Sequence, residues 1–233
     1  MVVRRGTLAD QVSQEITALI ENAGLQPGDE IPPEGELATR FGVNRLAVRE
    51  AIRTLAAREM VLSSQGKPTR VHVPTAQVFG QVLRFRLRQD SLRFADVLDA
   101  RRAIEGALVR RAAERVRAGG ASLDQAEELL DRMRETTGSR ERFVDLDIAF
   151  HTELAALAGN GMLTLALDAM TGILREHRLA SYAGHATRGD SHDSTIAAHH
   201  GILKAVRSGD PVAAAEAMES HLSETEKDIN AGN

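Results

Sequence analysis

The chain has 233 residues, a net charge of −4 and no cysteine, and only 3% of its residues are aromatic. This length is sufficient for two domains, and the absence of cysteine excludes disulfides and thiolate metal sites, which is typical of an intracellular protein. The first residues, MVVRRGTLADQ, contain no apolar export signal, and no run of about 18 apolar residues predicts a membrane span. We therefore expect a mainly α, cytoplasmic protein without a membrane partner.

Residues 36–55, ELATRFGVNRLAVREAIRTL, have the pattern of a helix-turn-helix. Two short helices would meet at a Gly42–Val43 corner, and Asn44 is a favourable N-cap for the second helix. The apolar face of that second helix consists of Val48, Ala51, Ile52 and Leu55. Arg49 and Arg53 lie away from this face, so the helix would present cations to a DNA groove. An ordinary helical hairpin with a solvated arginine face fits the same spacing.

The distribution of charge favours the DNA-binding alternative. Residues 1–39 contain two arginines against seven acidic residues, whereas residues 40–70 contain seven cations against two acidic residues. The positive surplus therefore falls on the helix-turn-helix and on the segment that follows it. A local basic patch of this kind, rather than the net charge, attracts a phosphate backbone.

The segments around this motif predict a winged helix. Residues 7–23 have an apolar helical stripe and end at glycine and proline. Two short apolar runs, near 60–64 and 70–73, flank a Gly/Pro turn and predict a β-hairpin. Gly66 and Lys67 would form its tip and contact a minor groove or a phosphate. Three helices and this hairpin make up a winged helix-turn-helix domain over residues 1–73.

These motifs, in this order, resemble the winged-helix domain of the GntR family of bacterial transcription regulators. The matching segments are LQPGDEIPPEGELATRFGVNR, AVREAIRTLAAREMV and the wing QGKPTRV. Their order and the wing are similar to those of the FadR branch. The resemblance implies a regulator that binds double-stranded DNA. The residues that we expect to contact DNA are Asn44, Arg45, Leu46, Ala47, Arg49, Arg53, Gly66 and Lys67.

Two departures from the family pattern concern the DNA contacts. Gly35 stands where the family often has an arginine that contacts DNA, so one anchor is missing. Leu46 and Ala47 replace a more usual polar or Thr-Pro pair. Their apolar groups suit contact with a thymine methyl group.

Residues 74–78 are predicted to be a linker, and residues 79–233 an all-helical antiparallel bundle. Glycines, with neighbouring Asn, Asp or Pro, separate its predicted helices. The first of these helices begins at residue 78, the last residue of the linker. These helices lie near 78–89, 92–117, 122–136, 140–158, 161–183, 191–208 and 211–229.

Four side chains of this bundle are candidates for a metal site. Asp147 and His151 are four residues apart and share the apolar face of one predicted helix. His199 and His221 each lie on the apolar stripe of a later helix. Together the four would offer three imidazoles and one carboxylate, which suit Zn²⁺, Ni²⁺ or Mn²⁺. For each histidine taken singly, a hydrogen-bonded core position is the alternative.

Residues 96–222 resemble the all-helical effector domain called FCD, which is found in FadR-type regulators. Its pattern is a D-x3-H pair, then a histidine before Ile-Leu, then a histidine before Leu. The matching residues are Asp147, His151, His199 and His221. Some members of the family lack these ligands. This chain has all four of them and therefore resembles the metal-binding members.

Arg101 lies on an apolar helical stripe, unlike Arg102, and an inward arginine needs an anion as its partner. One candidate partner is Glu105 or Asp147. The other is the carboxylate of a small effector, and the resemblance favours it because an arginine here is a usual effector contact in the family. Asn160 is predicted to be a helix cap. We expect the remaining candidates to lie in the core or on the surface, namely Met162, Met170, His177, His185 and His192.

Three functions fit these residues. The first is a homodimeric regulator that binds a near-palindromic operator and responds to a small carboxylate held by Arg101 and a metal. The second is the same regulator with a purely structural metal and no effector. The third is a His/Asp metalloenzyme, against which the sequence offers no separate general base, no nucleophile motif and no phosphate loop.

Overall fold

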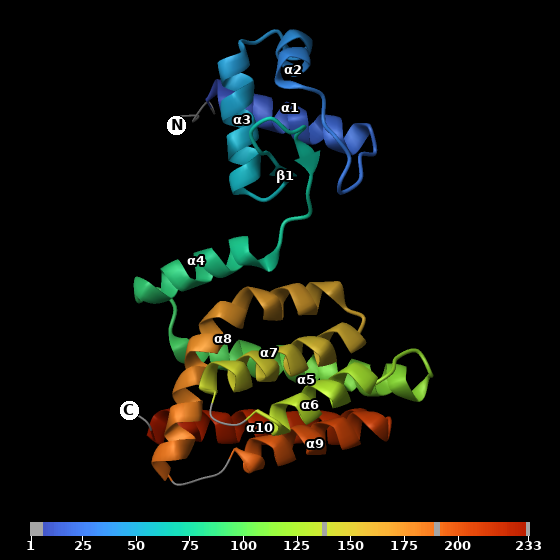
Figure 1. Cartoon of the computed structure of the whole chain (residues 1–233), viewed down its shortest axis with the longest axis vertical. Helices are drawn as coiled ribbons and strands as arrows, with labels where there is room; N and C mark the ends of the chain where they lie inside the picture. Colours follow the sequence, from blue (N-terminus) through green and yellow to red (C-terminus); the bar gives the residue numbers. More distant parts are fainter. Residues whose placement is uncertain (1–6, 137–138, 189–191, 232–233) are drawn as a thin grey trace, which may run out of the picture. The chain divides into compact units, whose positions relative to one another are not determined.

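The computed structural model describes residues 7–136, 139–188 and 192–231, and the side chains of 7–136, 139–183 and 192–227. It divides into two compact units, Met1–Val78 and Phe79–Asn233, and each is described by itself. The described residues form ten helices and one two-stranded sheet (Figure 1). The predicted mainly α fold, with a winged helix-turn-helix followed by a helical bundle, is confirmed.

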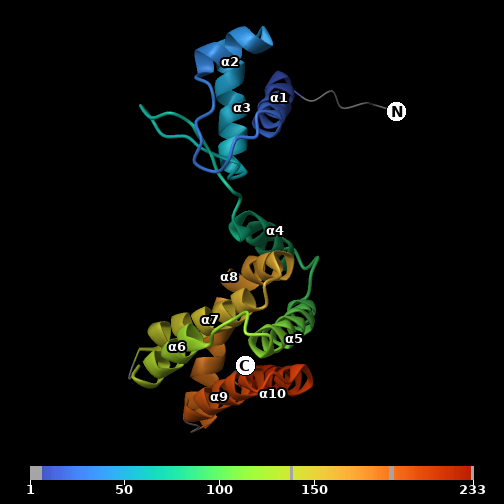
Figure 2. The same ribbon diagram turned by 90° about the vertical axis from the view of Figure 1, so that its right-hand side faces the viewer.

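The first unit is a winged helix. Its helices are α1 (Leu8–Asn22), α2 (Glu34–Phe41) and α3 (Arg45–Ala57), and its strands are β1 (Val61–Leu62) and β2 (Arg70–Val71). Figure 2 shows α3 beside both other helices, with the hairpin following it. Apolar side chains from all five elements form one core, which includes Val12, Ile16, Leu37, Val48, Ile52, Leu55, Val61 and Val71.

The predicted corner and cap define the two helices of the helix-turn-helix. Gly42 ends α2 with a φ of 65°, a left-handed conformation that glycine adopts without a steric cost. Asn44 has extended backbone, and its side-chain oxygen accepts a hydrogen bond of 2.8 Å from the Ala47 amide. This bond satisfies one of the free amides in the first turn of α3.

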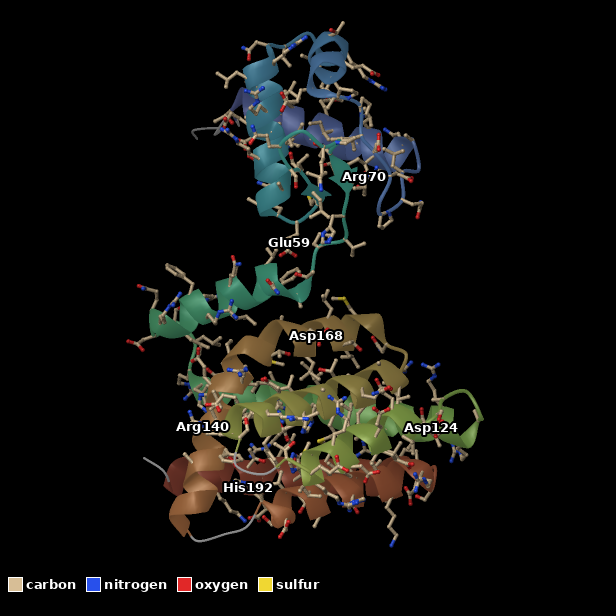
Figure 3. The ribbon with its side chains drawn as sticks, in the orientation of Figure 1. Glu59, Arg70, Asp124, Arg140, Asp168 and His192 are labelled. Atoms are coloured by element: carbon tan, nitrogen blue, oxygen red, sulfur yellow. The ribbon has the colours of Figure 1, made fainter. Side chains whose placement is uncertain are left out.

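The wing is shorter than predicted, because each strand contains only two residues. Val61 pairs with Val71, and Leu62 pairs with Arg70, in antiparallel register. Strand β2 also has a second partner that the sequence pattern does not predict, because the backbone of Glu30 bridges to Arg70. The Arg70 guanidinium, labelled in Figure 3, bonds the carboxylate of Glu30 and the carbonyl oxygen of Gly28. The segment before α2 therefore holds the base of the wing.

Glu59 holds the segment that leaves the winged helix. It follows α3 with a φ of 57°, and its carboxylate (Figure 3) accepts hydrogen bonds from the amide and the hydroxyl of Thr75. Thr75 in turn accepts a bond of 3.3 Å from the Gln77 amide, at the start of α4 (Ala76–Arg88). Residues 76–78 of the predicted linker are consequently helical, whereas the linker assignment as a domain boundary stays a prediction.

The second unit is a helical bundle whose elements begin and end close to their predicted positions. After α4 they are α5 (Phe94–Arg117), α6 (Asp124–Arg134), α7 (Arg140–Leu157), α8 (Gly161–Arg188), α9 (Asp193–Arg207) and α10 (Pro211–Ala231). The largest difference is at α8, which continues five residues beyond the predicted end at 183. Asn160 caps this helix as predicted, accepting a bond of 3.2 Å from the Leu163 amide.

Helix α5 is central to the bundle, because it contacts α7, α8, α9 and α10. Apolar residues of α5, α6, α7, α9 and α10 form one hydrophobic cluster, and those of α5, α7 and α8 form another. Both Figure 1 and Figure 2 show α9 and α10 lying side by side. Among the described residues, no helix is both long enough and apolar enough to cross a membrane.

Candidate metal centre

Asp147 and His151 project from α7 into the bundle. They are one helical turn apart and on the same face as buried Phe143, Phe150 and Leu154, so packing of this apolar face carries both polar groups inward. Asp147 is 6% exposed and His151 is 3% exposed. A carboxylate and an imidazole buried to this extent require polar partners.

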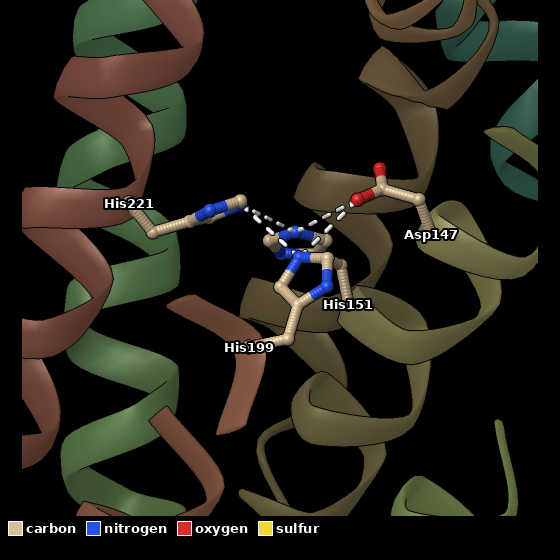
Figure 4. Close-up of side chains that lie close together, drawn as sticks. All are labelled: Asp147, His151, His199 and His221. Atoms are coloured by element: carbon tan, nitrogen blue, oxygen red, sulfur yellow. Dashed lines mark hydrogen bonds and ion pairs between the residues drawn. The ribbon is translucent and has the colours of Figure 1, made fainter. Parts of the chain in front are cut away.

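The histidines of α9 and α10 meet this pair from the other side of the core (Figure 4). The Nε2 atom of His199 lies 3.2 Å from Oδ1 of Asp147 and 3.3 Å from Nε2 of His221. The His221 Nε2 atom lies 3.2 Å from Nε2 of His151. One ligand atom from each of the four residues thus lies within 4.8 Å of every other. The structure brings together all four candidates from three helices.

Glu105 of α5 orients His151. Its carboxylate bonds Nδ1 of His151 through one oxygen, and Nε of Arg101 through the other at 2.5 Å. A carboxylate only accepts hydrogen bonds when ionised, so Nδ1 of His151 carries the proton. The lone pair of its Nε2 atom therefore points into the cluster, as in a histidine that binds a metal.

Arg178 of α8 has the corresponding position behind Asp147. Its guanidinium pairs with Oδ2 of Asp147, which leaves Oδ1 to face the histidines. Arg178 is 7% exposed, and burial together with the charge of Arg101 lowers its pKa to about 10, so it stays charged at neutral pH. The Asp147 carboxylate is thereby held in one orientation with one oxygen available.

The ionisation of the cluster suits a divalent cation. Burial lowers the pKa of His151 to about 4, although the charge of Glu105 opposes this shift. Burial also holds the pKa of His221 well below its ordinary value. Burial alone would raise the pKa of the Asp147 carboxyl, but the Arg178 guanidinium and the neighbouring histidines outweigh it and hold that pKa well below the usual range. At neutral pH His151 and His221 are therefore neutral imidazoles, and Asp147 is an ionised carboxylate.

These donors fit a divalent transition metal. The Nε2 atom of His221 lies 3.2 Å from that of His151 and 3.3 Å from that of His199. A neutral imidazole carries a proton on only one of its two nitrogens, so these close nitrogens have few protons to share in hydrogen bonds. A cation at the centre would replace these contacts with four bonds from nitrogen and oxygen. Three nitrogens and one oxygen are a common ligand set for Zn²⁺ and suit Ni²⁺ and Mn²⁺ as well.

A small cavity of about 30 Å³ adjoins the cluster. Asp147 and His221 line it together with Arg101 and Arg178, and its further lining includes Ser181, Tyr182, His192, Thr195 and Thr225. A space of this size holds only one or two water molecules. A larger ligand would have to displace these side chains.

Arg101 has one of its predicted partners, and part of its guanidinium is left over. Its Nε atom pairs with Glu105, which was one of the two alternative partners. Its Nη2 atom, however, is buried, and no described residue supplies a hydrogen-bond partner for it. Because Arg101 is 4% exposed and lines the cavity, this N–H group is available to an anion inside it.

The sequence pattern does not predict the roles of Arg178 and Glu105 in this centre, and it places His192 elsewhere. Arg178 shares the helical stripe of buried Leu174 and Ser181, so the test that selected Arg101 would also have selected it. Glu105 was considered only as a partner of Arg101, not of His151. His192 (Figure 3) was assigned to the core or the surface, but it lines the cavity.

The other assignments to core or surface have mixed outcomes. Met170 is 5% exposed, Met162 is 74% exposed, and His177 is half-buried and stacked on Phe94. His185 lies outside the described side chains.

The predicted DNA contacts lie on α3 and the wing. Arg45, Arg49 and Arg53 are exposed, as are Gly66 and Lys67 at the wing tip. Two of these arginines carry acidic partners in the free protein: Arg49 pairs with Glu34 at 3.0 Å, and Arg53 pairs with Glu50 at 2.6 Å.

The two apolar positions of α3 differ from one another. Leu46 is 65% exposed, whereas Ala47 is only 8% exposed, so the Ala47 methyl group offers little surface to a base.

Gly35 lies close to the side chain of Arg45. A Cβ atom on Gly35 would lie 3.1 Å from a guanidinium nitrogen of Arg45. The missing side chain therefore leaves room for Arg45.

Comparison with known proteins agrees with both units. The sequence model of the bacterial regulatory proteins of the gntR family matches residues 8–71, and that of the FCD domain matches residues 96–224. The solved structure of a GntR protein from Streptococcus agalactiae has the same fold, with a TM-score of 0.67 and 24% identity over 94% of this chain and 99% of that one.

Relatives of known description cover almost the whole chain. The HTH-type transcriptional repressor NanR of Cronobacter sakazakii is 29% identical over 94% of this chain and 84% of its own length. An L-lactate dehydrogenase operon regulatory protein of Escherichia coli strain K12 is 28% identical over 96% of this chain and 86% of its own length. With a winged helix matched to one domain model and the helical bundle matched to the other, the chain belongs to the GntR family of DNA-binding transcriptional regulators that carry an FCD domain.

Proposed function

We propose that this regulator binds its operator as a homodimer, and that a small carboxylate bound at a metal centre in the helical unit controls this binding. One observation carries the proposal. The unpartnered Nη2 atom of buried Arg101 shares a cavity with Asp147 and His221 of the three-histidine, one-carboxylate cluster. A metal cation and the Arg101 guanidinium on two sides of this cavity would both attract a small anion.

The metal in this proposal is Zn²⁺, with Ni²⁺ or Mn²⁺ as alternatives. The ligands are Asp147, His151, His199 and His221, whose donor atoms converge in the structure. A bound cation supplies a positive charge and an open coordination position to a carboxylate. Arg101 orients the same carboxylate through its free N–H group.

The size of the cavity explains how binding would be transmitted. A space of about 30 Å³ is too small for an organic acid, so occupation requires movement of lining side chains from α7, α8, α9 and α10. A ligand shifts an equilibrium only if it binds one arrangement better than another. The closed arrangement described here and an opened, occupied one provide two such states.

The DNA contacts in this proposal come from the exposed face of α3 and from the wing. Arg45, Arg49 and Arg53 would contact groove and phosphates, and Lys67 would contact an adjacent phosphate. Two copies would place their α3 helices in successive major grooves of a near-palindromic operator. Function on DNA makes the cytoplasm the location.

The descriptions of the relatives suggest whether the regulator represses or activates, and which class of ligand to test. One of them is described as a repressor and another as a regulator of an L-lactate dehydrogenase operon. We accordingly propose repression as the mode of action and small 2-hydroxy acids as the first ligands to test. Membership of the FadR branch stays a prediction from the sequence.

The structural-metal alternative and the enzyme alternative make different demands. A structural metal leaves the free N–H group of Arg101 without a purpose. An enzyme needs a general base beside the metal, but both described carboxylates at the centre, Glu105 and Asp147, are held by arginines. We therefore propose that the chain is not an enzyme.

Thermal unfolding of the helical unit tests the proposal. Removal of metal should lower the melting temperature, because a ligand that binds only the folded state stabilises it. A small hydroxy acid should raise that temperature only when Zn²⁺ is present, and Arg101→Ala should abolish the acid-dependent rise alone. Arg111→Ala, at an exposed position of α5, is the matched control. An acid-dependent rise that survives in Arg101→Ala would exclude Arg101 as the clamp. If no acid shifts the metal-loaded protein, the structural-metal alternative stands.

A further inference from the structure

Helix α4 has two apolar faces, and only one of them is covered. Leu83 and Leu87 pack against the hydrophobic cluster of α5, α7 and α8, and Gly80 lies against the backbone of Ala169 in α8. This inner face explains why α4 lies beside α8 in both ribbon views (Figures 1 and 2).

The outer face of α4 consists of Phe79, Val82 and Phe85, which are 57%, 57% and 59% exposed. Their spacing of three residues places them along one side of the helix. They belong to none of the three hydrophobic clusters that the described residues form. The chain has only six phenylalanines, and two of them stand on this face. An exposed apolar stripe of this composition indicates an interaction surface.

We propose that this α4 face, Phe79–Val82–Phe85, is the apolar centre of the homodimer interface, and that the α4 helices of two copies pack on it in antiparallel orientation. The inference rests on the homodimer of the proposed function and names its surface. Two properties of α4 favour a second copy of the chain as the occupant.

The first property is the symmetry of the sequence. Phe79 and Phe85 lie at equal distances on either side of Val82. In an isologous dimer the same patch faces itself across a two-fold axis. With Val82 on that axis, Phe79 of one copy meets Phe85 of the other, and the two Val82 residues meet each other. The stripe is therefore complementary to itself in the antiparallel orientation.

The second property is the placement of charge. The described α4 has arginines only in its C-terminal half, at 84, 86 and 88, and no acidic residue. A parallel pair would bring each Arg86 opposite its own copy, and like charges so close repel. In the antiparallel pair Arg86 lies opposite Val78, and the two Arg86 residues are about 12 Å apart along the axis at 1.5 Å per residue. That separation exceeds the screening length of about 8 Å at physiological ionic strength.

The area of this face shows how much of a dimer interface it can supply. A phenylalanine buries about 150–250 Å² when it is fully covered, so the exposed parts of the three side chains offer roughly 300 Å² per copy. A stable interface buries about 800 Å² per partner. The α4 face accordingly supplies the apolar centre, and the polar rim around it includes Arg86 and Gln89, which lie on the same side of α4.

Association of the 233-residue, metal-loaded chain tests this surface. Val82→Asp should raise the dissociation constant of the dimer at least about tenfold in sedimentation experiments, because it places a charge at the apolar centre. Val212→Asp is the matched control, since Val212 is 54% exposed on α10. It should leave the dissociation constant unchanged, and circular dichroism should show both variants folded.

Crosslinking tests the orientation independently of variant stability. The chain has no cysteine, so single cysteines can be introduced without background. With a short bifunctional maleimide, Val82→Cys should give covalent dimers. Phe79→Cys and Phe85→Cys should crosslink poorly when alone and well when mixed, whereas Val212→Cys should not crosslink.

Each contrary result has a distinct meaning. A dimer that is unaffected by Val82→Asp, without a crosslink at Val82→Cys, overturns the surface. Efficient crosslinking of Phe79→Cys with itself overturns the antiparallel orientation. Loss of binding to anionic lipid vesicles in Val82→Asp, with an unchanged dimer, would assign the face to a membrane instead. If the unaltered chain is monomeric and still binds DNA, the homodimer of the proposed function fails as well, whereas an unaffected dimer on the operator removes only this inference.

Discussion

At the scale of single residues, the candidate metal centre depends on carboxylates and guanidinium groups that hold the proposed ligands in place. Glu105 bonds both Arg101 and His151, and Arg178 bonds the distal oxygen of Asp147. Such partners fix the orientation of the ligands and are themselves buried. Arg101 differs from Arg178 because one of its N–H groups is left over.

Glu105→Gln should lower the affinity for Zn²⁺ about 10- to 100-fold, because an uncharged amide holds the His151 ring less firmly than a carboxylate does. Competition with a chromogenic chelator measures this affinity. The matched control is Glu114→Gln, at an exposed position of the same helix α5. Equal affinities for the two variants would show that Glu105 does not support the ligand.

Arg49→Gln should weaken operator binding at all sequences alike and reduce the slope of log K against log salt by about 0.9, as expected for the loss of one phosphate contact. The free protein pairs Arg49 with Glu34 on the surface, an ion pair weak enough for DNA to replace. A fluorescence titration at several salt concentrations gives the slope. Arg110→Gln, exposed on α5 of the other unit, should leave it unchanged. An unaltered slope in Arg49→Gln would remove Arg49 from the DNA contacts.

At the scale of elements, most of the fold followed from periodicity and caps. The stripe of α1, the Gly42 corner, the Asn44 cap and the glycines between the helices of the bundle placed the helices within a few residues. Local sequence determines these features, so one sequence suffices to predict them. The structure differs in detail at α8, which continues five residues beyond the predicted end, and at the hairpin, whose strands have only two residues each.

The candidate site shows the same division between local and tertiary information. Asp147 and His151 were selected because an i, i+4 pair on an apolar face is a local pattern. The bond between His151 and Glu105 joins residues that are 46 positions apart, and no periodicity reports it. His192 likewise lines a cavity whose other lining residues come from α5, α7, α8, α9 and α10, and no local pattern reports this packing.

Asn44→Ala should destabilise the winged-helix unit by about 1 kcal/mol, because the first turn of α3 loses the acceptor for the Ala47 amide. Chemical denaturation followed by circular dichroism measures this loss. Asn22→Ala, exposed at the last residue of α1, is the control and should change stability far less. If both variants lose the same stability, the side-chain cap of α3 contributes nothing specific.

At the scale of the whole molecule, two units carry separate chemistry. The winged helix carries exposed arginines, and the helical bundle carries a buried centre with an adjoining cavity. Neither unit alone makes a ligand-responsive regulator. The proposal therefore requires that occupation of the cavity changes the affinity of the winged helix for DNA, with a coupling that is typically 5- to 150-fold.

Operator affinity with and without a small acid tests this coupling most directly. A duplex selected from random DNA by the Zn²⁺-loaded protein would be titrated in the presence of L-lactate and related 2-hydroxy acids, with fluorescence anisotropy as the readout. The account predicts that at least one acid changes the dissociation constant by about fivefold or more, and that Arg101→Ala and the metal-free protein bind the duplex without responding to the acid. An equal response in Arg101→Ala, or no response to any acid that raises the melting temperature, would contradict it.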